Sequence, residues 1–273
     1  MAVLAGLRMP AAQDRPKTYS NPLGATLTPI RDGVWLAERP FYPRLPGLTG
    51  VDVACKSAVL RLRDGGLFVH APVELDDATK RAIDALGPVK FIVTPNTEHL
   101  KYAKQWIEAY PEAKSFACPG LRAKRPDIGF GATVGADEAG SFTTAPPEGW
   151  PAEVLFCWMD AEKAPLGLLG NKPFFSEVVF CHVPSKVLFV TDLWWNYPSG
   201  DGVPKSSRLW KAGMDMIYKP VYNNLMKIKP THDARVSRVL AWDFDYMAPC
   251  HGEPVEGTTV KAQLAKHLAY PWP

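Results

Sequence analysis

The sequence lacks any C-x-x-C pair, and its five cysteines lie far apart, at Cys55, Cys118, Cys157, Cys181 and Cys250. This pattern excludes a zinc ribbon and a disulfide framework and favours a reducing compartment, for which we expect the cytoplasm. No apolar run approaches the roughly 18 residues of a membrane-spanning helix, so we expect no membrane span. Residues 1–27 have no sustained apolar region typical of a secretory signal. We expect a poorly ordered leader there, and its basic charge leaves import into an organelle open.

Neither sign of charge dominates the chain. Its 31 basic and 28 acidic residues give a net charge of +3, which is too small to imply nucleic-acid binding. Hydrophobic residues make up 47% and charged residues 22% of the chain, which is typical of a folded protein and argues against disorder. The 273 residues are enough for one large domain or two small ones.

Hydrophobic patterning predicts two successive sets of strands and helices. In the first half, we expect a helix over 78–86, with an N-cap at Asp76-Asp77 and a stop at Gly87, and a second helix that begins near His99. The remaining predicted helices cover 235–242 and 260–269. The predicted strands cover 34–36, 57–62, 67–70, 90–94, 115–118, 154–159, 177–183, 187–193 and 246–249. Residues 119–150 predict a long loop or a weak hairpin.

The most informative segment is FIVTPNTEHLKYAKQW, residues 91–106. Glu98 and His99 are expected at a turn between a strand and a helix, where side chains meet at the carboxyl edge of a sheet. A carboxylate and an imidazole in that place can bind a divalent metal. Alternatively, Glu98 only complements the helix N-terminus and His99 is a satisfied core histidine.

Two further strand ends place polar side chains in similar positions. Asp192 closes the buried strand of KVLFVTDLWW, although an acid there also commonly caps a turn. His251 follows another short strand, and Gly252 lets the backbone turn sharply behind the imidazole. We therefore regard Asp192 and His251 as further candidate ligands.

The chain resembles the metallo-β-lactamase superfamily in the order of its elements and in three motifs: the strand-turn-helix of 91–106, the Thr-Asp that closes a strand, and the late P-x-H-G of 249–252. The resemblance covers roughly residues 28–265 and points to a divergent branch of unknown function. It implies a single domain over 28–273. The fold implied is a four-layer α/β/β/α sandwich with a metal site at one edge of the two sheets.

The resemblance also implies that one half of the family's two-metal site is lost. The H-x-H-x-D-H motif falls on residues 94–99, where Thr94 and Asn96 replace its first two histidines. The middle histidine falls near Pro173 and is absent. These three positions hold one of the two metals in the superfamily.

The other half keeps side chains that can bind a metal. Its positions fall on Glu98, His99, Asp192 and His251, which implies one divalent ion, namely zinc, iron or manganese, or no ion at all. The implied function is a mononuclear metal-dependent hydrolase of an ester, thioester or phosphoester, with Glu98 and Asp192 as catalytic carboxylates. The alternatives are a non-catalytic binding or scaffold module and redox chemistry at a single iron.

The substrate is expected to be a small molecule, and a local charge suggests that it is anionic. Residues 199–230 have six basic and two acidic side chains and, by the resemblance, border the mouth of the site. His70 is an outside candidate for a supporting or replacement ligand, and His182 is expected to be a surface or loop histidine. The sequence does not indicate the oligomeric state.

Overall fold

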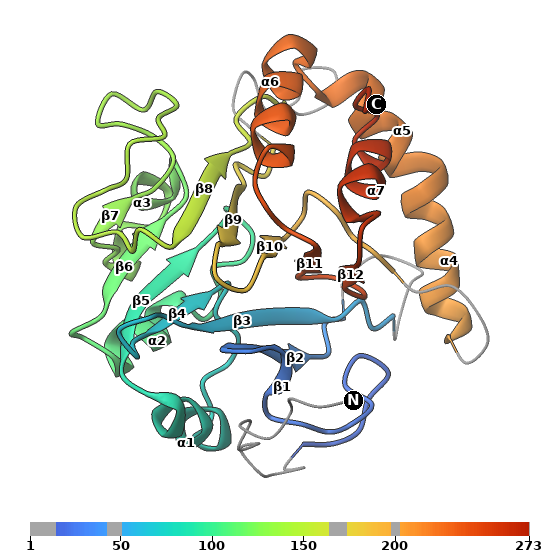
Figure 1. Cartoon of the computed structure of the whole chain (residues 1–273). Helices are drawn as coiled ribbons and strands as arrows, with labels where there is room; N and C mark the ends of the chain where they lie inside the picture. The colour runs from blue at the N-terminus through green and yellow to red at the C-terminus, as the bar shows by residue number, and fades with distance from the viewer. Residues whose placement is uncertain (1–14, 43–50, 164–173, 198–202, 273) are drawn as a thin grey trace.

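Two β-sheets pack face to face in the computed structural model, and helices cover the outer face of each (Figure 1). The structure describes residues 15–42, 51–163, 174–197 and 203–272. The layers follow the order α/β/β/α, so the predicted four-layer sandwich is confirmed. None of the described helices is both long and apolar enough to cross a membrane.

The first sheet has seven strands in the order of the sequence. They are β1 (Thr28–Arg31), β2 (Val34–Arg39), β3 (Cys55–Arg61), β4 (Leu67–His70), β5 (Val89–Thr94), β6 (Lys114–Ala117) and β7 (Ala132–Thr133). The strands β1 to β4 pair antiparallel, and β4 to β7 pair parallel. The parallel pairs require crossovers, which α1 (Asp77–Leu86) and α2 (Ala103–Ala109) supply.

The second sheet has five strands in the order β12-β11-β10-β9-β8. They are β8 (Val154–Trp158), β9 (Val178–His182), β10 (Val187–Val190), β11 (Tyr246–Pro249) and β12 (Val255–Glu256). Only β10 and β11 are parallel, and the chain between them includes α6 (Lys229–Leu240). The last helix, α7 (Val260–His267), packs beside α6.

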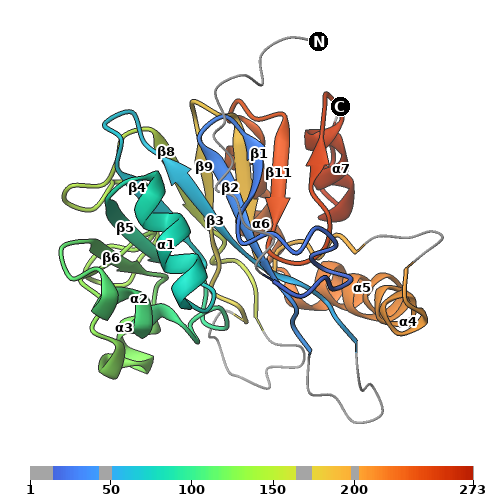
Figure 2. The ribbon, with the colours of Figure 1, turned by 90° about the horizontal axis from the view of Figure 1, so that it is seen from below.

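Three apolar layers hold the sandwich together. Between the sheets, Phe68 of β4 packs against Phe180 of β9. Outside the first sheet, Ile83 of α1 and Trp106 of α2 pack on the strands, as the position of these helices in Figure 2 shows. Outside the second sheet, α6 and α7 bury their apolar faces, for example at Leu264. Burial of large side chains of this kind contributes roughly 1.5–3 kcal/mol each.

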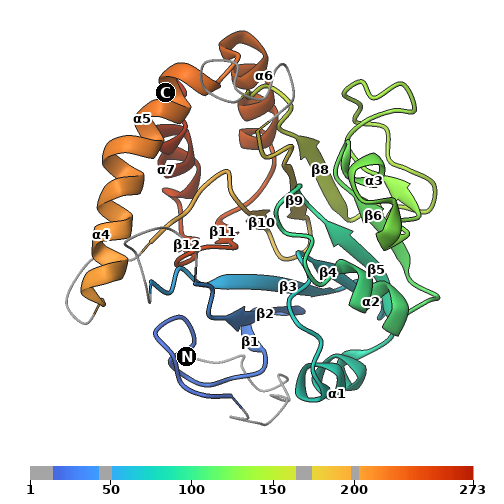
Figure 3. The same cartoon turned by 180° about the vertical axis from the view of Figure 1, so that it is seen from behind.

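Two regions contain helices that the sequence did not predict. Residues 119–150 contain α3 (Leu121–Lys124), a short 3-10 turn η1 (Pro126–Ile128) and strand β7. A long helix also runs from 205 to 226 along α7 (Figure 3), with no counterpart among the predicted elements. Its parts are α4 (Lys205–Gly213), the π-helical turn η3 (Met214–Tyr218), α5 (Lys219–Val221) and the π-helical turn η4 (Tyr222–Met226).

The predicted leader falls partly outside the described residues, because 1–14 are not described. Residues 15–27 lie against the first sheet, where Leu27 is buried. Arg15 Nη2 donates to Asp76 Oδ1 at 2.6 Å and to Thr79 Oγ1 at 2.7 Å. The domain start at residue 28 stays a prediction, although β1 does begin at Thr28.

Asp76 is the N-cap of α1, as the sequence predicts. Its Oδ1 accepts the backbone N–H of Thr79 at 2.9 Å. We expect Asp76→Ala to lower the free energy of unfolding by about 1–2 kcal/mol, because this N–H and Arg15 lose their acceptor. Urea denaturation measures the effect. The control is Asp77→Ala, an exposed acid of the same turn, and equal losses in the two variants would contradict the capping role.

Candidate metal centre

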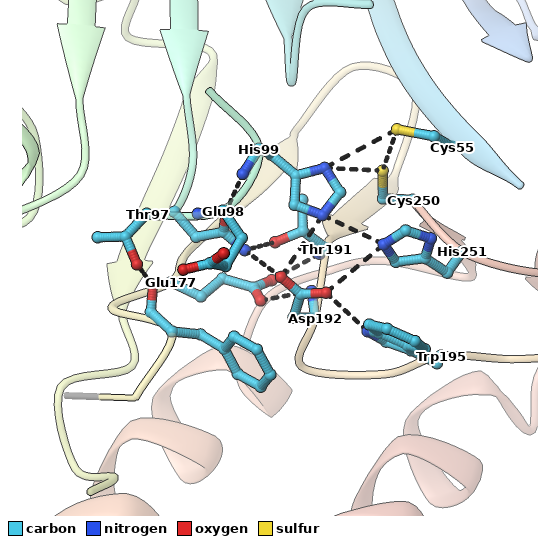
Figure 4. Close-up of polar contacts among 12 residues, drawn as sticks. Cys55, Thr97, Glu98, His99, Glu177, Thr191, Asp192, Trp195, Cys250 and His251 are labelled. Atoms are coloured by element: carbon cyan, nitrogen blue, oxygen red, sulfur yellow. Dashed lines mark hydrogen bonds and ion pairs between the residues drawn. The ribbon is translucent and has the colours of Figure 1, made fainter. Parts of the chain in front are cut away.

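Three strand ends meet at one point between the two sheets (Figure 4). His99 follows β5 of the first sheet, whereas Asp192 and His251 follow β10 and β11 of the second. Since β10 and β11 run parallel, their carboxyl ends reach the same edge. The structure thus brings together three of the four residues that the sequence suggested as ligands.

Each pair of these side chains has donor atoms within 3.5 Å, and Asp192 uses a different oxygen toward each imidazole. His99 Nε2 is 3.2 Å from His251 Nε2 and 3.4 Å from Asp192 Oδ2, and His251 Nε2 is 3.5 Å from Asp192 Oδ1. Ligand atoms about 2.0–2.1 Å from a tetrahedral zinc lie about 3.3–3.4 Å apart. Two imidazoles and a carboxylate at this spacing fit a divalent ion and leave a fourth position open, as in catalytic zinc sites.

A backbone carbonyl fixes the tautomer of the His251 ring. His251 Nδ1 lies 2.6 Å from the carbonyl oxygen of Ala54, which can only accept, so Nδ1 bears a proton and Nε2 is the nitrogen that has the lone pair in the neutral ring. Ala54 has a left-handed φ of 56°, and its N–H donates to Asp52 Oδ1 at 3.0 Å. A side chain at Gly252 (φ 88°) would collide with the carbonyl of Asn196, so the predicted need for glycine behind His251 is confirmed.

Two donors hold the Asp192 carboxylate. Asn96 Nδ2 donates to Oδ2 at 2.6 Å, and Trp195 Nε1 donates to Oδ1 at 2.7 Å. Burial opposes ionisation of Asp192, but the imidazoles of His99 and His251 hold the pKa of its carboxyl well below its usual range. Burial likewise acts to lower the pKa of His99, and the Asp192 carboxylate raises it well above its usual value. The Asp192 carboxylate therefore stays ionised, which is the form that binds a metal ion.

Glu177 positions the turn that presents Asp192, and sequence reasoning missed it. Its buried carboxylate accepts the backbone N–H groups of Thr191, Asp192 and Leu193 at 2.6–2.8 Å. Burial raises the pKa of Glu177 to about 7, the Asp192 carboxylate adds to this, and the N–H groups oppose it. Its place at the start of a predicted strand gave no sign of this role.

Asn96, which the resemblance aligns with a histidine of the superfamily, organises the turn before His99. Its Oδ1 accepts the N–H groups of Glu98 and His99 at 3.0 and 2.8 Å. The sequence signal available was Pro-Asn, since asparagine often forms such turns. The turn delays the helix, so α2 begins at Ala103 and not near His99.

Glu98 is not brought into the cluster. Its side chain is 59% exposed, and its Oε1 lies 3.9 Å from Lys124 Nζ. It does line the cavity described below.

Two cysteines occupy the other side of the His99 ring, and the sequence gave no reason to pair them. His99 Nδ1 is 3.3 Å from Cys250 Sγ and 4.0 Å from Cys55 Sγ, and the two sulfurs are 3.7 Å apart (Figure 4). The Cys250 hydrogen bond and the His99 imidazole hold the pKa of the Cys55 thiol well below its usual range despite burial. Burial and the neighbouring Cys55 raise the pKa of Cys250. The available signal was that Cys250 directly precedes His251.

The two other histidines considered from the sequence lie outside both ligand groups. His70 is buried beside the rings of Phe180 and Phe189, and burial lowers its pKa to about 3. The expectation of a surface position for His182 is wrong: it is buried at the end of β9, where its Nδ1 lies 2.8 Å from Ser185 Oγ.

A cavity of about 830 Å³ opens beside the cluster. Cys55, His99, Asp192 and His251 form part of its wall. Six aromatic side chains form much of the rest: Phe41, Tyr102, Phe174, Phe175, Trp195 and Trp210. A largely apolar cavity wall next to a few convergent polar groups is typical of sites that bind small molecules.

The basic segment does not supply the charge that the sequence suggested for this wall. Of the described part of 199–230, only Trp210 lines the cavity. Lys211 pairs with Asp215 at 2.5 Å, and Lys227 donates to the carbonyl of Leu268. Among the described wall residues, the basic ones are Arg15, Arg39 and Lys101.

Comparisons with known proteins agree with this fold. The sequence model of a family described as "Domain of unknown function (DUF4336)" matches residues 32–205. A comparison with curated protein sequences finds no match. The structure is similar to a metallo-β-lactamase from Hirschia baltica, with a TM-score of 0.56 and 11% identity over 90% of this chain and 98% of that one.

Two further solved structures are similar to the same extent. FIM-1, a metallo-β-lactamase from Pseudomonas aeruginosa in its mono-zinc form, has a TM-score of 0.54 and 15% identity over 95% of this chain and all of that one. The metal-soaked Flv1 flavodiiron core from Synechocystis has a TM-score of 0.59 and 12% identity over 89% of this chain and 60% of that one. At these identities the likeness concerns the fold, which is the metallo-β-lactamase fold.

Proposed function

The chain belongs to the DUF4336 family of domains of unknown function, and we propose that it is a metal-dependent hydrolase whose ion is held by His99, Asp192 and His251. The observation that supports this most is the spacing of donor atoms between each pair of these side chains, at 3.2–3.5 Å, in the wall of a cavity. When bound, a divalent ion at this site supplies Lewis acidity and lowers the pKa of water. Zinc, iron and manganese all accept such a donor set.

The protein's own residues prepare this site before any ion arrives. Asn96 and Trp195 hold both oxygens of Asp192, and the Ala54 carbonyl holds His251 with Nε2 free. These contacts restrict rotation of the ligands, which lowers the entropic cost of binding. Supporting contacts of this type typically contribute 10–100-fold in metal affinity.

The cavity wall suggests the kind of substrate. Its aromatic side chains can bind the apolar part of a small ester, thioester or phosphoester and keep water away from it. Glu98 lines the cavity and lies in the turn that Asn96 holds, next to His99. We propose that its carboxylate accepts a proton during hydrolysis. Its exposed position argues against its use as a ligand.

Metal analysis and activity assays on His251→Ala test the proposal. We expect the purified variant to retain at most about one tenth of the wild-type metal occupancy at the proposed site and to hydrolyse its best substrate at least about 100-fold more slowly. The assay measures metal content of protein purified without chelator and turnover of a panel of esters, thioesters and phosphoesters. Glu98→Gln is the matched control: we expect unchanged metal content with reduced turnover.

One observation favours a second candidate function, a metal-binding module without catalysis. Asn96 Nδ2 donates to Asp192 Oδ2 and so occupies a lone pair of the ligand, and the resemblance aligns Asn96 with a lost histidine ligand. Stoichiometric metal in the wild type without turnover of any compound in the panel would support this module. Unchanged metal content in His251→Ala would contradict both functions.

A further inference from the structure

Cys55 and Cys250 belong to two different sheets and yet face the same imidazole. Cys55 is the first residue of β3 in the first sheet, and Cys250 follows β11 in the second. Neither position corresponds to a ligand position in the resemblance to the superfamily described above. Both sulfurs lie on the Nδ1 side of His99, whereas the hydrolase ligands lie on its Nε2 side (Figure 4).

The spacing of these atoms fits a tetrahedral ion. Two sulfurs about 2.3 Å from zinc lie about 3.8 Å apart, and a sulfur and a nitrogen lie about 3.6 Å apart. The Sγ atoms of Cys55 and Cys250 are 3.7 Å apart, and their distances to His99 Nδ1 are 4.0 and 3.3 Å. The three donor atoms therefore form one face of a coordination tetrahedron of about the size that zinc requires, without any movement of the backbone.

Cys250 Sγ has one contact of each kind with Lys56. The backbone N–H of Lys56 points to the sulfur at 3.4 Å, which favours a thiolate, and the sulfur lies 3.1 Å from the Lys56 carbonyl, to which a thiol donates. The Cys55 side chain lines the cavity, so an ion can reach the pair from solvent. The other three cysteines, Cys118, Cys157 and Cys181, are buried, and none of them belongs to a ligand group among the described residues.

We propose that Cys55, Cys250 and Nδ1 of His99 form a second metal site, for an ion that prefers thiolate ligands such as zinc. Two thiolates and an imidazole make this site softer than the group of His99, Asp192 and His251. The two sites use opposite nitrogens of one ring, so occupancy of either depends on His99, and both are filled together only if the ring also gives up its N–H proton. The second site is inferred from the positions of these three ligands alone and does not require the hydrolase activity.

Cobalt titration of the reduced, chelator-treated protein tests the site, because thiolate ligands give cobalt a charge-transfer absorption that nitrogen and oxygen ligands do not. We expect this absorption in the wild type and its loss in Cys55→Ser/Cys250→Ser. His251→Ala should keep it, and Cys181→Ser is the control for loss of a buried thiol. His99→Ala should lose it together with the metal of the other site.

Alkylation of the wild-type protein gives a readout that needs no variant. Bound zinc should slow the reaction of Cys55 with iodoacetamide at least about tenfold, as followed by mass spectrometry, and a chelator should restore the rate. Absence of the thiolate absorption in the wild type, or equal alkylation with and without zinc, would overturn the second site. If His251→Ala keeps the absorption but the wild type hydrolyses no compound of the panel, the hydrolase fails and the thiolate site stands.

Discussion

Replacing Glu177 by alanine is expected to lower the free energy of unfolding by about 4 kcal/mol, which is the largest stability effect that we expect from the site. Three buried N–H groups, those of Thr191, Asp192 and Leu193, would lose their acceptor. Each buried donor without a partner costs about 1–3 kcal/mol. Relief of the buried Glu177 charge offsets part of this sum. Urea denaturation at pH 7.5 in the presence of chelator measures the change.

Two further variants make this result specific. Glu177→Gln keeps one acceptor oxygen but turns an amide toward the N–H groups, so we expect a loss of about 2 kcal/mol. Glu256→Ala removes an exposed carboxylate of the same sheet and should change stability by less than about 0.5 kcal/mol. Equal stabilities of Glu177→Ala and the wild type would show that water replaces the carboxylate and that the turn does not depend on it.

The contribution of Glu162 to the stability of the chelator-treated protein is expected to fall by about 3 kcal/mol as the pH rises from 4.5 to above 7. This buried carboxyl group accepts the N–H of Phe175 at 2.9 Å. Burial raises the pKa of Glu162 from its usual 4.5 to about 7, against the effect of the Phe175 N–H and of Tyr222. The folded protein therefore holds a proton that the unfolded chain releases.

The direction follows from this difference in proton binding. The stabilising contribution is complete below about pH 4.5 and is lost as the pH rises through about 7, at about 1.4 kcal/mol per pH unit. Glu162→Gln cannot titrate, so the stability of the variant relative to the wild type should rise by about 3 kcal/mol over this range. Urea denaturation at several pH values measures it. Glu177 titrates in both proteins and cancels, and parallel curves would contradict the assignment.

Much of the fold could be predicted because its strands are short, buried and bounded by turn residues. β4 and β11 have the ends that the sequence predicts, and α1 extends the predicted helix by one residue, to Asp77 at its N-terminus. The long helix from 205 to 226 could not be found in the same way. Several of its apolar side chains face solvent, including Met216 and Ile217 at 76% and 68% exposure. Tyr222 and Met226 are buried, but they lie in its last turns, so no continuous apolar stripe marks the whole helix.

The sequence predicted the residues of the candidate site that directly follow a strand, and it did not predict the others. Asp192 and His251 were found because strand ends share an edge of the sheet. Glu98 was expected to join them, but the turn organised by Asn96 leaves it in solvent. Cys55 and Cys250 are 195 residues apart and belong to different sheets, and a pairing of that kind has no local pattern in the sequence.

The centre lies between the two sheets, so an ion bound there would also stabilise the fold. One sheet contributes Cys55 and His99 and the other contributes Asp192, Cys250 and His251, so an ion bound there is a cross-link between the halves of the sandwich. The sheets can then separate only if coordination breaks, and an ion at 100 times its dissociation constant adds about 2.7 kcal/mol to the stability of the whole. A substitution that loosens the packing of Phe68 on Phe180 would therefore also lower the affinity for the ion. The ring contacts described for these two residues include no ligand of the centre.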